Sequence, residues 1–329
     1  MTRCILIAAC AILAGCVNAD NSGGNVVDGD GSNGTGVIAT PNEALLSAPQ
    51  SSSSDSVTTI RFGVLTIDGA VSVNRRYRPL LNYLEEKTGY RFELVLLNQN
   101  SQFSEVQSNN IDFITNNPMA AVQIQHLHET EFLVTTSRPN TGTQLGAVIV
   151  VRDDSGIEKI DDLKNKKAAC VNFETAAAGC AFQLLHLKKN DFHPFKEFNL
   201  FVENPSQDNI VLSVLNNTID VGFVRTGQLE KMQANGQIND LSELRVLDRV
   251  NDNFFYDHTT ALYPEWPVAA LKDTDPAVVE AVREALLEIP EGHSALQRAR
   301  FDGFVEPVDY SPIQLLIDEL RLRSWSVNG

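Results

Sequence analysis

Residues 59–97 read TIRFGVLTIDGAVSVNRRYRPLLNYLEEKTGYRFELVLL, and this stretch places a strand, a helix and a second strand in immediate succession. The apolar runs at 59–65 and 92–97 predict buried strands. Between them, apolar residues recur at helical spacing over 76–87, and Gly89 follows at the position typical of a glycine that ends a helix. This order predicts two parallel strands of one sheet, joined by a right-handed crossover.

The same alternation continues along the chain. Further strands are predicted at 111–115, 147–151, 168–171, 198–202 and 219–224. Helices are predicted at 103–109, from Pro118, at 175–189, 209–215 and 228–234, with three more from Pro276 onward. Residues 244–247 predict a strand that returns to the first group of strands.

Two groups of strands predict an α/β protein with two lobes, each built on a doubly wound sheet and joined by a hinge. We expect residues 58–142 and 250–329 to form lobe 1 and residues 143–249 to form lobe 2. In open α/β sheets a ligand binds beyond the carboxyl ends of the strands. The loops that follow the strands should therefore face each other across a cleft.

The overall composition argues against nucleic-acid binding. The 329 residues carry 26 basic and 42 acidic side chains, a formal net charge of −16. Non-specific binding of nucleic acid depends on basic side chains that neutralise phosphates, and these are outnumbered here. Hydrophobic residues make up 43% of the chain, which is enough for a folded core.

The N-terminus reads as an export signal. Residues 1–15 combine Arg3 with a short apolar run that cannot span a bilayer. Leu13-Ala14-Gly15-Cys16 resembles the lipobox of bacterial lipoproteins, in which cleavage precedes the cysteine and its thiol receives a lipid. An ordinary signal peptide cut nearby is the alternative. Val17 differs from the acidic residue that retains such lipoproteins in the inner membrane, so the resemblance favours the outer membrane.

Residues 16–57, which begin at the candidate lipidated cysteine, are predicted to be a disordered tether. The stretch 17–57 contains five acidic residues, no lysine or arginine, and mostly Asn, Asp, Gly and Ser. So little apolar surface cannot offset the entropy of ordering. The sequence therefore predicts a folded body on a flexible linker.

Two cysteines remain in the predicted body, Cys170 and Cys180, within ACVNFETAAAGCA. In an exported protein such a pair most often forms a structural disulfide. Two buried free thiols, zinc ligands or a catalytic thiol are the alternatives. No set of further Cys or His residues lies close by in sequence to complete a metal site. A catalytic thiol would need a base, and His186 is the only candidate near in sequence. We expect neither a metal nor a cofactor.

Several motifs resemble those of the phosphate, phosphite and phosphonate ABC transporter substrate-binding proteins. They are RFGVL at 61–65, YLEEKTG at 83–89, IDF at 111–113, DNIVLSVL at 208–215 and IDVGFVR at 219–225. Three more resemble the periplasmic sensor region of tetrathionate-sensor-like histidine kinases: DFITNNP at 112–118, RTGQLE at 225–230 and LYPEWPVAAL at 262–271. The resemblance covers nearly all of 58–323 and implies the bilobal type II periplasmic-binding-protein fold.

The resemblance implies an oxyanion site at a helix N-terminus. Family members place a Ser-Thr-Ser-Gly run there, and the equivalent loop at 172–179 reads NFETAAAG. Thr175 keeps a hydroxyl, and backbone N–H groups from Thr175 to Ala177, including that of Ala176, remain to bind an anion. Thr175 could equally be an ordinary N-cap. Glu174 is expected to place a carboxylate where the anion would lie, a departure from a phosphate or phosphonate site.

Further ligand contacts are implied in lobe 2. The family's Ser-His-Asp signature reads Ser206, Gln207 and Asp208 here, although Ser206 or Asp208 could simply cap the next helix. Arg225, with Thr226 beside it, follows an apolar strand. A guanidinium binds oxyanions in bidentate fashion, so Arg225 is the strongest predicted anion contact, and a structural salt bridge is its alternative.

Lobe 1 and the connecting segment contribute the remaining candidates. Hydroxyl and amide groups follow the predicted strands at Thr66, Thr115, Asn116 and Asn117. Tyr256 and His258 lie in FFYDHTT, which should border the cleft. His258 could donate to an oxyanion or simply be a satisfied hydrogen-bonding residue. Core packing is the default interpretation of Trp266.

These features predict a lipid-anchored periplasmic solute-binding protein that is not an enzyme. Its lobes would close over a small oxyanion, phosphate- or phosphonate-like or a sulfur oxyanion, for an ABC importer. A ligand-sensing accessory protein for a two-component histidine kinase is the alternative, and a thiol enzyme or a surface adaptor on the same fold is a further one. The expected partners are the oxyanion, an ABC permease or a sensor kinase, and the membrane through the lipid.

Overall fold

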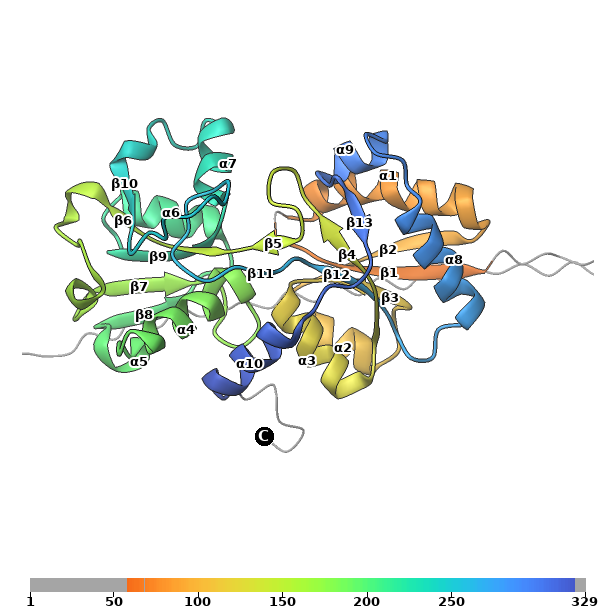
Figure 1. The fold of residues 1–329 in the computed structure, drawn as a ribbon, viewed down its shortest axis with the longest axis horizontal. Helices are drawn as coiled ribbons and strands as arrows, with labels where there is room; N and C mark the ends of the chain where they lie inside the picture. Colours follow the sequence, from red (N-terminus) through yellow and green to blue (C-terminus); the bar gives the residue numbers. More distant parts are fainter. Residues whose placement is uncertain (1–57, 68, 323–329) are drawn as a thin grey trace, which may run out of the picture. The chain divides into compact units, whose positions relative to one another are not determined.

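A computed structural model of the chain describes residues 58–67 and 69–322. The predicted signal segment 1–15, Cys16 and the tether 16–57 lie outside these residues. The described residues belong to one compact unit (Figure 1). None of the described helices combines the length and the hydropathy that crossing a membrane requires.

One sheet of this unit has six strands in the order β13-β4-β12-β3-β1-β2. The strands are β1 (Thr59–Leu65), β2 (Arg91–Leu97), β3 (Phe113–Thr115), β4 (Glu131–Ser137), β12 (Pro267–Ala270) and β13 (Gly303–Val305). β1 lies parallel between β2 and β3, which confirms the strand–helix–strand prediction for 59–97. β4, β12 and β13 join antiparallel and were not predicted.

Helices cover both faces of this first sheet (Figure 1). They are α1 (Ala70–Thr88), α2 (Ser101–Gln107), α3 (Pro118–His128), α8 (Pro276–Leu287) and α9 (Ser294–Ala299). Side chains from α1, α8 and α9 share one apolar cluster with Phe62 and Phe113, whereas α2 and α3 pack with Leu97 and Ile114. Successive residues of a strand point to opposite faces, so the continuous apolar runs serve both layers. α1 begins at Ala70, before the predicted residue 76. The prediction missed these first residues because they are largely exposed and carry no apolar stripe.

The second sheet has five strands in the order β10-β6-β9-β7-β8. The strands are β6 (Ala147–Arg152), β7 (Lys167–Cys170), β8 (Leu200–Glu203), β9 (Val221–Arg225) and β10 (Leu244–Val246). The prediction that 244–247 return to the first group is wrong, because β10 pairs antiparallel with β6. Leu244 and Leu247 are buried in the apolar cluster of the second sheet, which holds β10 there.

The helices of the second sheet are α4 (Phe182–Lys189), α5 (Pro194–Glu197), α6 (Gln207–Leu215) and α7 (Gln228–Ala234). Short 3₁₀ turns occupy Asp153–Ser155, Ile160–Leu163 and Leu241–Glu243. The predicted helix 175–189 is divided into a π-helical turn, Ala177–Ala181, and α4. In this wide turn the Ala181 N–H donates to the Ala176 carbonyl at 3.0 Å. Such turns are rare and often mark functional positions.

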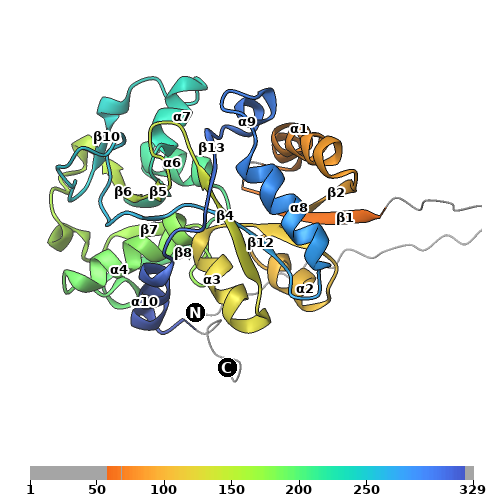
Figure 2. The same cartoon turned by 45° about the vertical axis from the view of Figure 1, so that its right-hand side comes forward.

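The chain passes between the two sheets at β5 (Gln144–Leu145) and β11 (Tyr263–Pro264), which pair antiparallel. The last helix, α10 (Ser311–Leu320), packs against both α3 and α4 (Figure 2). One apolar cluster there joins residues of both sheets, and in it Phe182 stacks on Tyr263 with ring centroids 4.0 Å apart. The exact lobe limits, 58–142 with 250–329 and 143–249, stay a prediction.

Candidate functional site

A cavity of about 1450 Å³ opens between the loops that follow the strands of both sheets. Thr66 follows β1, Asn172 follows β7, and Arg225 ends β9, and all three line the cavity. This is where open α/β sheets bind ligands. Among the described residues, no group of three or more His, Cys, Asp or Glu side chains could hold a metal ion.

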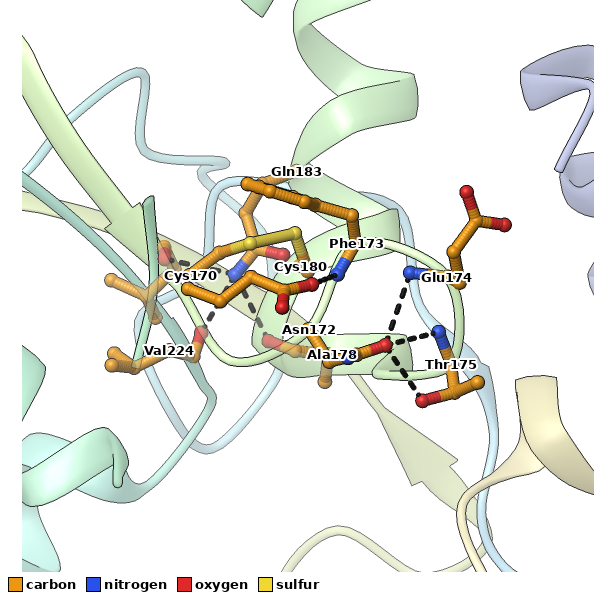
Figure 3. Close-up of a disulfide and its surroundings, with 11 residues drawn as sticks. Cys170, Asn172, Phe173, Glu174, Thr175, Ala178, Cys180, Gln183 and Val224 are labelled. Carbon is orange, nitrogen blue, oxygen red and sulfur yellow. Dashed lines mark hydrogen bonds between the residues drawn. A yellow bond between two sulfur atoms is a disulfide. The ribbon is translucent and has the colours of Figure 1, made fainter. Parts of the chain in front are cut away.

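The loop after β7 is closed by a disulfide between Cys170 and Cys180, whose Cα atoms lie 5.1 Å apart (Figure 3). Inside it, the side-chain oxygen of Asn172 accepts from the N–H groups of Glu174 and Thr175 at 3.1 and 2.9 Å. These bonds turn the chain in front of the π-helical turn. The disulfide also occupies both cysteines that the thiol-enzyme alternative requires.

The first turn after this loop lies along the cavity. Ala176, Ala177, Ala178 and Gly179 all line it. The first N–H groups of a helix have no partner inside the helix, and they lie at its positive end. A Cβ on Gly179 would lie 2.7 Å from Val171, so only glycine lets this turn pack so closely on the end of β7. The arrangement can therefore bind an anion with backbone atoms alone.

Glu174 does not occupy this anion position, contrary to expectation. Its side chain is absent from the cavity lining. In Figure 3 its carboxylate points away from Asn172 and Thr175. Its carbonyl accepts from the side chain of Gln123 on α3 at 3.0 Å, which fixes the residue against the first lobe. The carboxylate therefore gives no ground for excluding an anion from the loop.

The N-terminus of α6 lies beside this turn. The side-chain oxygen of Gln207 accepts from the backbone N–H of Arg225 at 2.8 Å. Ser206 caps α6, accepting from the Asn209 N–H at 3.2 Å, as one of its alternatives proposed. The guanidinium of Arg225 donates to the carbonyl of Thr226 at 2.7 Å, which holds it along the cavity wall.

Asp208 is held by side chains of α7 and the following loop. It accepts from Gln228, from Lys231 at 3.2 Å and from Gln237 at 2.9 Å. Burial alone would raise the pKa of Asp208, but the hydrogen bond from Gln237 and the charge of Lys231 lower it below its usual value. Asp208 is therefore ionised and committed to protein donors at neutral pH.

The wall from the first lobe carries residues that the sequence did not indicate. The guanidinium of Arg138, after β4, pairs with the buried carboxylate of Glu265 at 2.8 Å. It also lies over the rings of Phe301 and Trp266, 5.1 and 5.9 Å from their centroids. Arg76 donates to the carbonyl of Ala299 at 2.9 Å. Arg76, Arg138, Trp266 and Phe301 all line the cavity, so Trp266 is more than a core residue.

Comparison with known proteins identifies this architecture. The model of the phosphonate periplasmic substrate-binding proteins of ABC transporters matches residues 62–310. The chain belongs to this family. The expected fold is confirmed: it is the type II periplasmic-binding-protein fold, and the family places the protein in the periplasm. Its members are substrate-binding proteins and not enzymes.

Two solved structures resemble the chain. PhnD1 from Prochlorococcus marinus, in complex with methylphosphonate, has a TM-score of 0.66 at 13% identity and covers 80% of this chain and 98% of its own. A binding protein of an ABC phosphonate transporter from Pseudomonas aeruginosa has a TM-score of 0.67 at 16% identity, covering 82% and 90%. At these identities the likeness shows the fold alone.

A curated relative is the tetrathionate sensor histidine kinase TtrS of Salmonella typhimurium. It is 25% identical over 268 residues, which make up 80% of this chain and 44% of the kinase. The chain thus spans less than half the length of this relative.

The cavity gathers most of the predicted ligand contacts. They are Thr66, Asn117, Ala176, Ser206, Gln207, Asp208, Arg225, Thr226 and Tyr256. The ring of Tyr256 packs against Gly227. The side chain of Asn117 caps α3 with its oxygen and donates to the Thr175 carbonyl with its NH₂ group. Their part in binding a ligand stays a prediction.

Four other predicted contacts do not line the cavity, because they are buried in structural roles. Thr115 pairs within the sheet between β1 and β12. Asn116 donates to Gln102 at 2.9 Å. The Thr175 hydroxyl lies 2.9 Å from Gln99 and 2.8 Å from Asn172, so it joins two loops. His258 contacts the Thr260 carbonyl at 2.7 Å and the Asp252 carboxylate.

Proposed function

We propose that this protein captures a small oxyanion in the cavity between its lobes, for uptake by an ABC importer. The observation that carries the proposal is the meeting of three kinds of donor at one place. These are the helical N–H groups of Ala176–Gly179, the side chain of Gln207 and the guanidinium of Arg225. Together they form the hydrogen-bonding environment that an oxyanion needs when it leaves water.

The proposal is tested by binding. The purified soluble body should be stabilised by at least one of phosphate, methylphosphonate, sulfite, thiosulfate and tetrathionate, because a bound ligand raises the apparent melting temperature by mass action. The Arg225→Ala variant should bind that ligand about 10- to 100-fold more weakly, since a hydrogen bond to a charged group is lost.

Arg249→Ala is the matched control. Arg249 is 59% exposed, pairs with Asp257 at 2.8 Å and does not line the cavity, so its loss should leave affinity unchanged. The proposal fails when no oxyanion stabilises the protein, or when Arg225→Ala and Arg249→Ala bind alike.

The importer is supported by the family, and a sensory role by the tetrathionate sensor kinase among its relatives. We propose the ABC permease as the partner and keep a sensor kinase as the second candidate. Cross-linking in intact cells, followed by purification of the protein, separates the two. Recovery of permease subunits supports import, whereas recovery of a histidine kinase alone contradicts it.

We also propose that Cys16 carries a lipid that anchors the body at the outer membrane. The support is the Leu13-Ala14-Gly15-Cys16 motif and a family that works in the periplasm. Cells grown with labelled palmitate should label the native protein and not a Cys16→Ser variant, which should lose membrane association. Equal labelling of both proteins would contradict a lipid anchor at Cys16. Membrane fractionation then shows which membrane holds the native form.

A further inference from the structure

We propose that the cavity selects oxyanions that carry no proton, of the sulfonate and sulfate type, over the monoanions of phosphate and phosphonates. This inference rests on the proposed function, because it specifies which oxyanions that same site accepts. It follows from the hydrogen-bonding roles of the side chains in the wall formed by β7, α6 and β9.

Gln207 presents a donor to the cavity. Its side-chain oxygen is fixed by the backbone N–H of Arg225 at 2.8 Å, so the amide cannot turn over without losing that bond. The Nε2 group therefore faces the other way, 3.7 Å from the position that a Cβ on Gly179 would take. Within residues 58–67 and 69–322, this NH₂ group donates no hydrogen bond to the protein. It is a donor held beside the helical N–H groups.

The main acceptors of the same wall already have protein donors. Asn172 accepts from two N–H groups, and Asp208 accepts from Gln228, Lys231 and Gln237. The Thr226 hydroxyl exchanges hydrogen bonds with the backbone of Gly146. The exposed carboxylate of Glu203 directs one oxygen to the Phe173 N–H at 2.6 Å. The acceptors on Asn172, Asp208 and Thr226 are thus occupied, whereas the second oxygen of the exposed Glu203 carboxylate has no donor among the described residues.

Such a wall treats two classes of oxyanion differently. Sulfonate and sulfate groups have only acceptor oxygens at neutral pH. Phosphonates and phosphate monoesters keep one P–OH until their second ionisation, at about pH 6 to 7 for phosphate esters. Inorganic phosphate has two P–OH groups as a monoanion and still has one as a dianion. Beside the Gln207 amide and the first turn after Asn172 such a hydroxyl meets N–H donors and acceptors that are already occupied, and burying an unpaired polar group costs affinity. A histidine in place of Gln207, as in the family's Ser-His-Asp signature, has a ring nitrogen that can accept.

Matched ligands test this selectivity. The dissociation constants of methanesulfonate and methylphosphonate, and of sulfate and phosphate, are measured by calorimetry at about pH 6 and about pH 8.5. The sulfur member of each pair should bind at least about tenfold more tightly at the lower pH. Methylphosphonate should gain affinity at the higher pH as its last proton leaves, and phosphate should gain less because its dianion keeps one P–OH. The affinities of the sulfur members should not rise.

A second measurement uses Gln207→Glu, which keeps one oxygen on the Arg225 N–H and replaces the Nε2 donor by an acceptor. Its affinity for methanesulfonate should fall at least about tenfold, and the preference over methylphosphonate at about pH 6 should shrink. Gln233→Glu on the exposed face of α7 adds the same charge away from the cavity lining and should change neither value.

The inference is overturned when methylphosphonate binds as tightly as methanesulfonate at the lower pH. It is also overturned when Gln207→Glu, with an unchanged melting temperature, keeps the wild-type ratio. Both results leave oxyanion binding intact, so they differ from failure of the proposed function. If the proposed function itself fails, no oxyanion binds at either pH, and the selectivity proposal then fails as well.

Discussion

Arg138→Ala is expected to destabilise the protein by about 3 to 5 kcal/mol, because it leaves a buried carboxylate without its charged partner. The side chain of Glu265 is 2% exposed, and Arg138 Nε lies 2.8 Å from one of its oxygens. The other oxygen accepts from the Trp266 N–H at 3.0 Å, which cannot replace a cation. The stacking of the guanidinium over Phe301 is lost as well. Urea unfolding monitored by circular dichroism measures the free-energy difference.

Arg283→Ala is the control for this variant. Arg283 pairs with Glu306 on the surface, where that carboxylate is 63% exposed, so its loss should cost less than about 1 kcal/mol. The double variant Arg138→Met with Glu265→Gln should recover much of the stability, since the unpaired charge is removed. The argument is wrong if Arg138→Ala loses no more stability than Arg283→Ala.

The Arg138–Glu265 pair illustrates what the sequence could not supply. Its members are 127 residues apart, one after β4 and the other between β11 and β12. Neither β12, of four residues, nor β13, of three, is long enough to show a strand period. The longer alternation over 59–115 was predictable because each element there repeats its apolar period. The first-lobe wall of the cavity depends on pairings that local patterns do not encode.

The second-lobe wall was more accessible to sequence reasoning, because topology alone places loops after strands at one edge of a sheet. Arg225 was predicted in this way, whereas Gln207 was predicted from the resemblance to the family's Ser-His-Asp signature. The orientation of Glu174 was not, because it depends on the hydrogen bonds of Asn172 and on Gln123 from the other lobe. Thr175 was misplaced for the same reason: its hydroxyl joins Gln99 and Asn172, so it faces protein partners and not the cavity. Which groups face a ligand is decided by contacts between loops.

Removing the disulfide with the double variant Cys170→Ser, Cys180→Ser is expected to cost about 3 kcal/mol of stability. The bridge closes a loop with a sequence separation of 10. In the chain-entropy model, opening such a loop raises the conformational entropy of the unfolded chain and stabilises the unfolded state by about that amount. The same loop carries Asn172 and the helical N–H groups from Ala176 to Gly179 along the cavity. Ligand affinity should therefore also fall, because the released loop must be ordered again on binding.

Reduction of the wild-type protein provides the matched comparison, since it opens the bridge without changing a residue. Reductant should lower the urea midpoint of the wild type to that of the double variant and leave the variant unchanged. Titration with the oxyanion that stabilises the oxidised protein should give a higher affinity for the oxidised wild type than for the reduced wild type or the double variant. An identical midpoint for oxidised and reduced wild type would show that the bridge contributes nothing to stability. Equal affinities with unequal midpoints would show that the disulfide stabilises the fold without holding the anion-binding turn. The turn would then be held by the packing of Gly179 on Val171 and by the hydrogen bond from Gln183 to the Ala178 carbonyl.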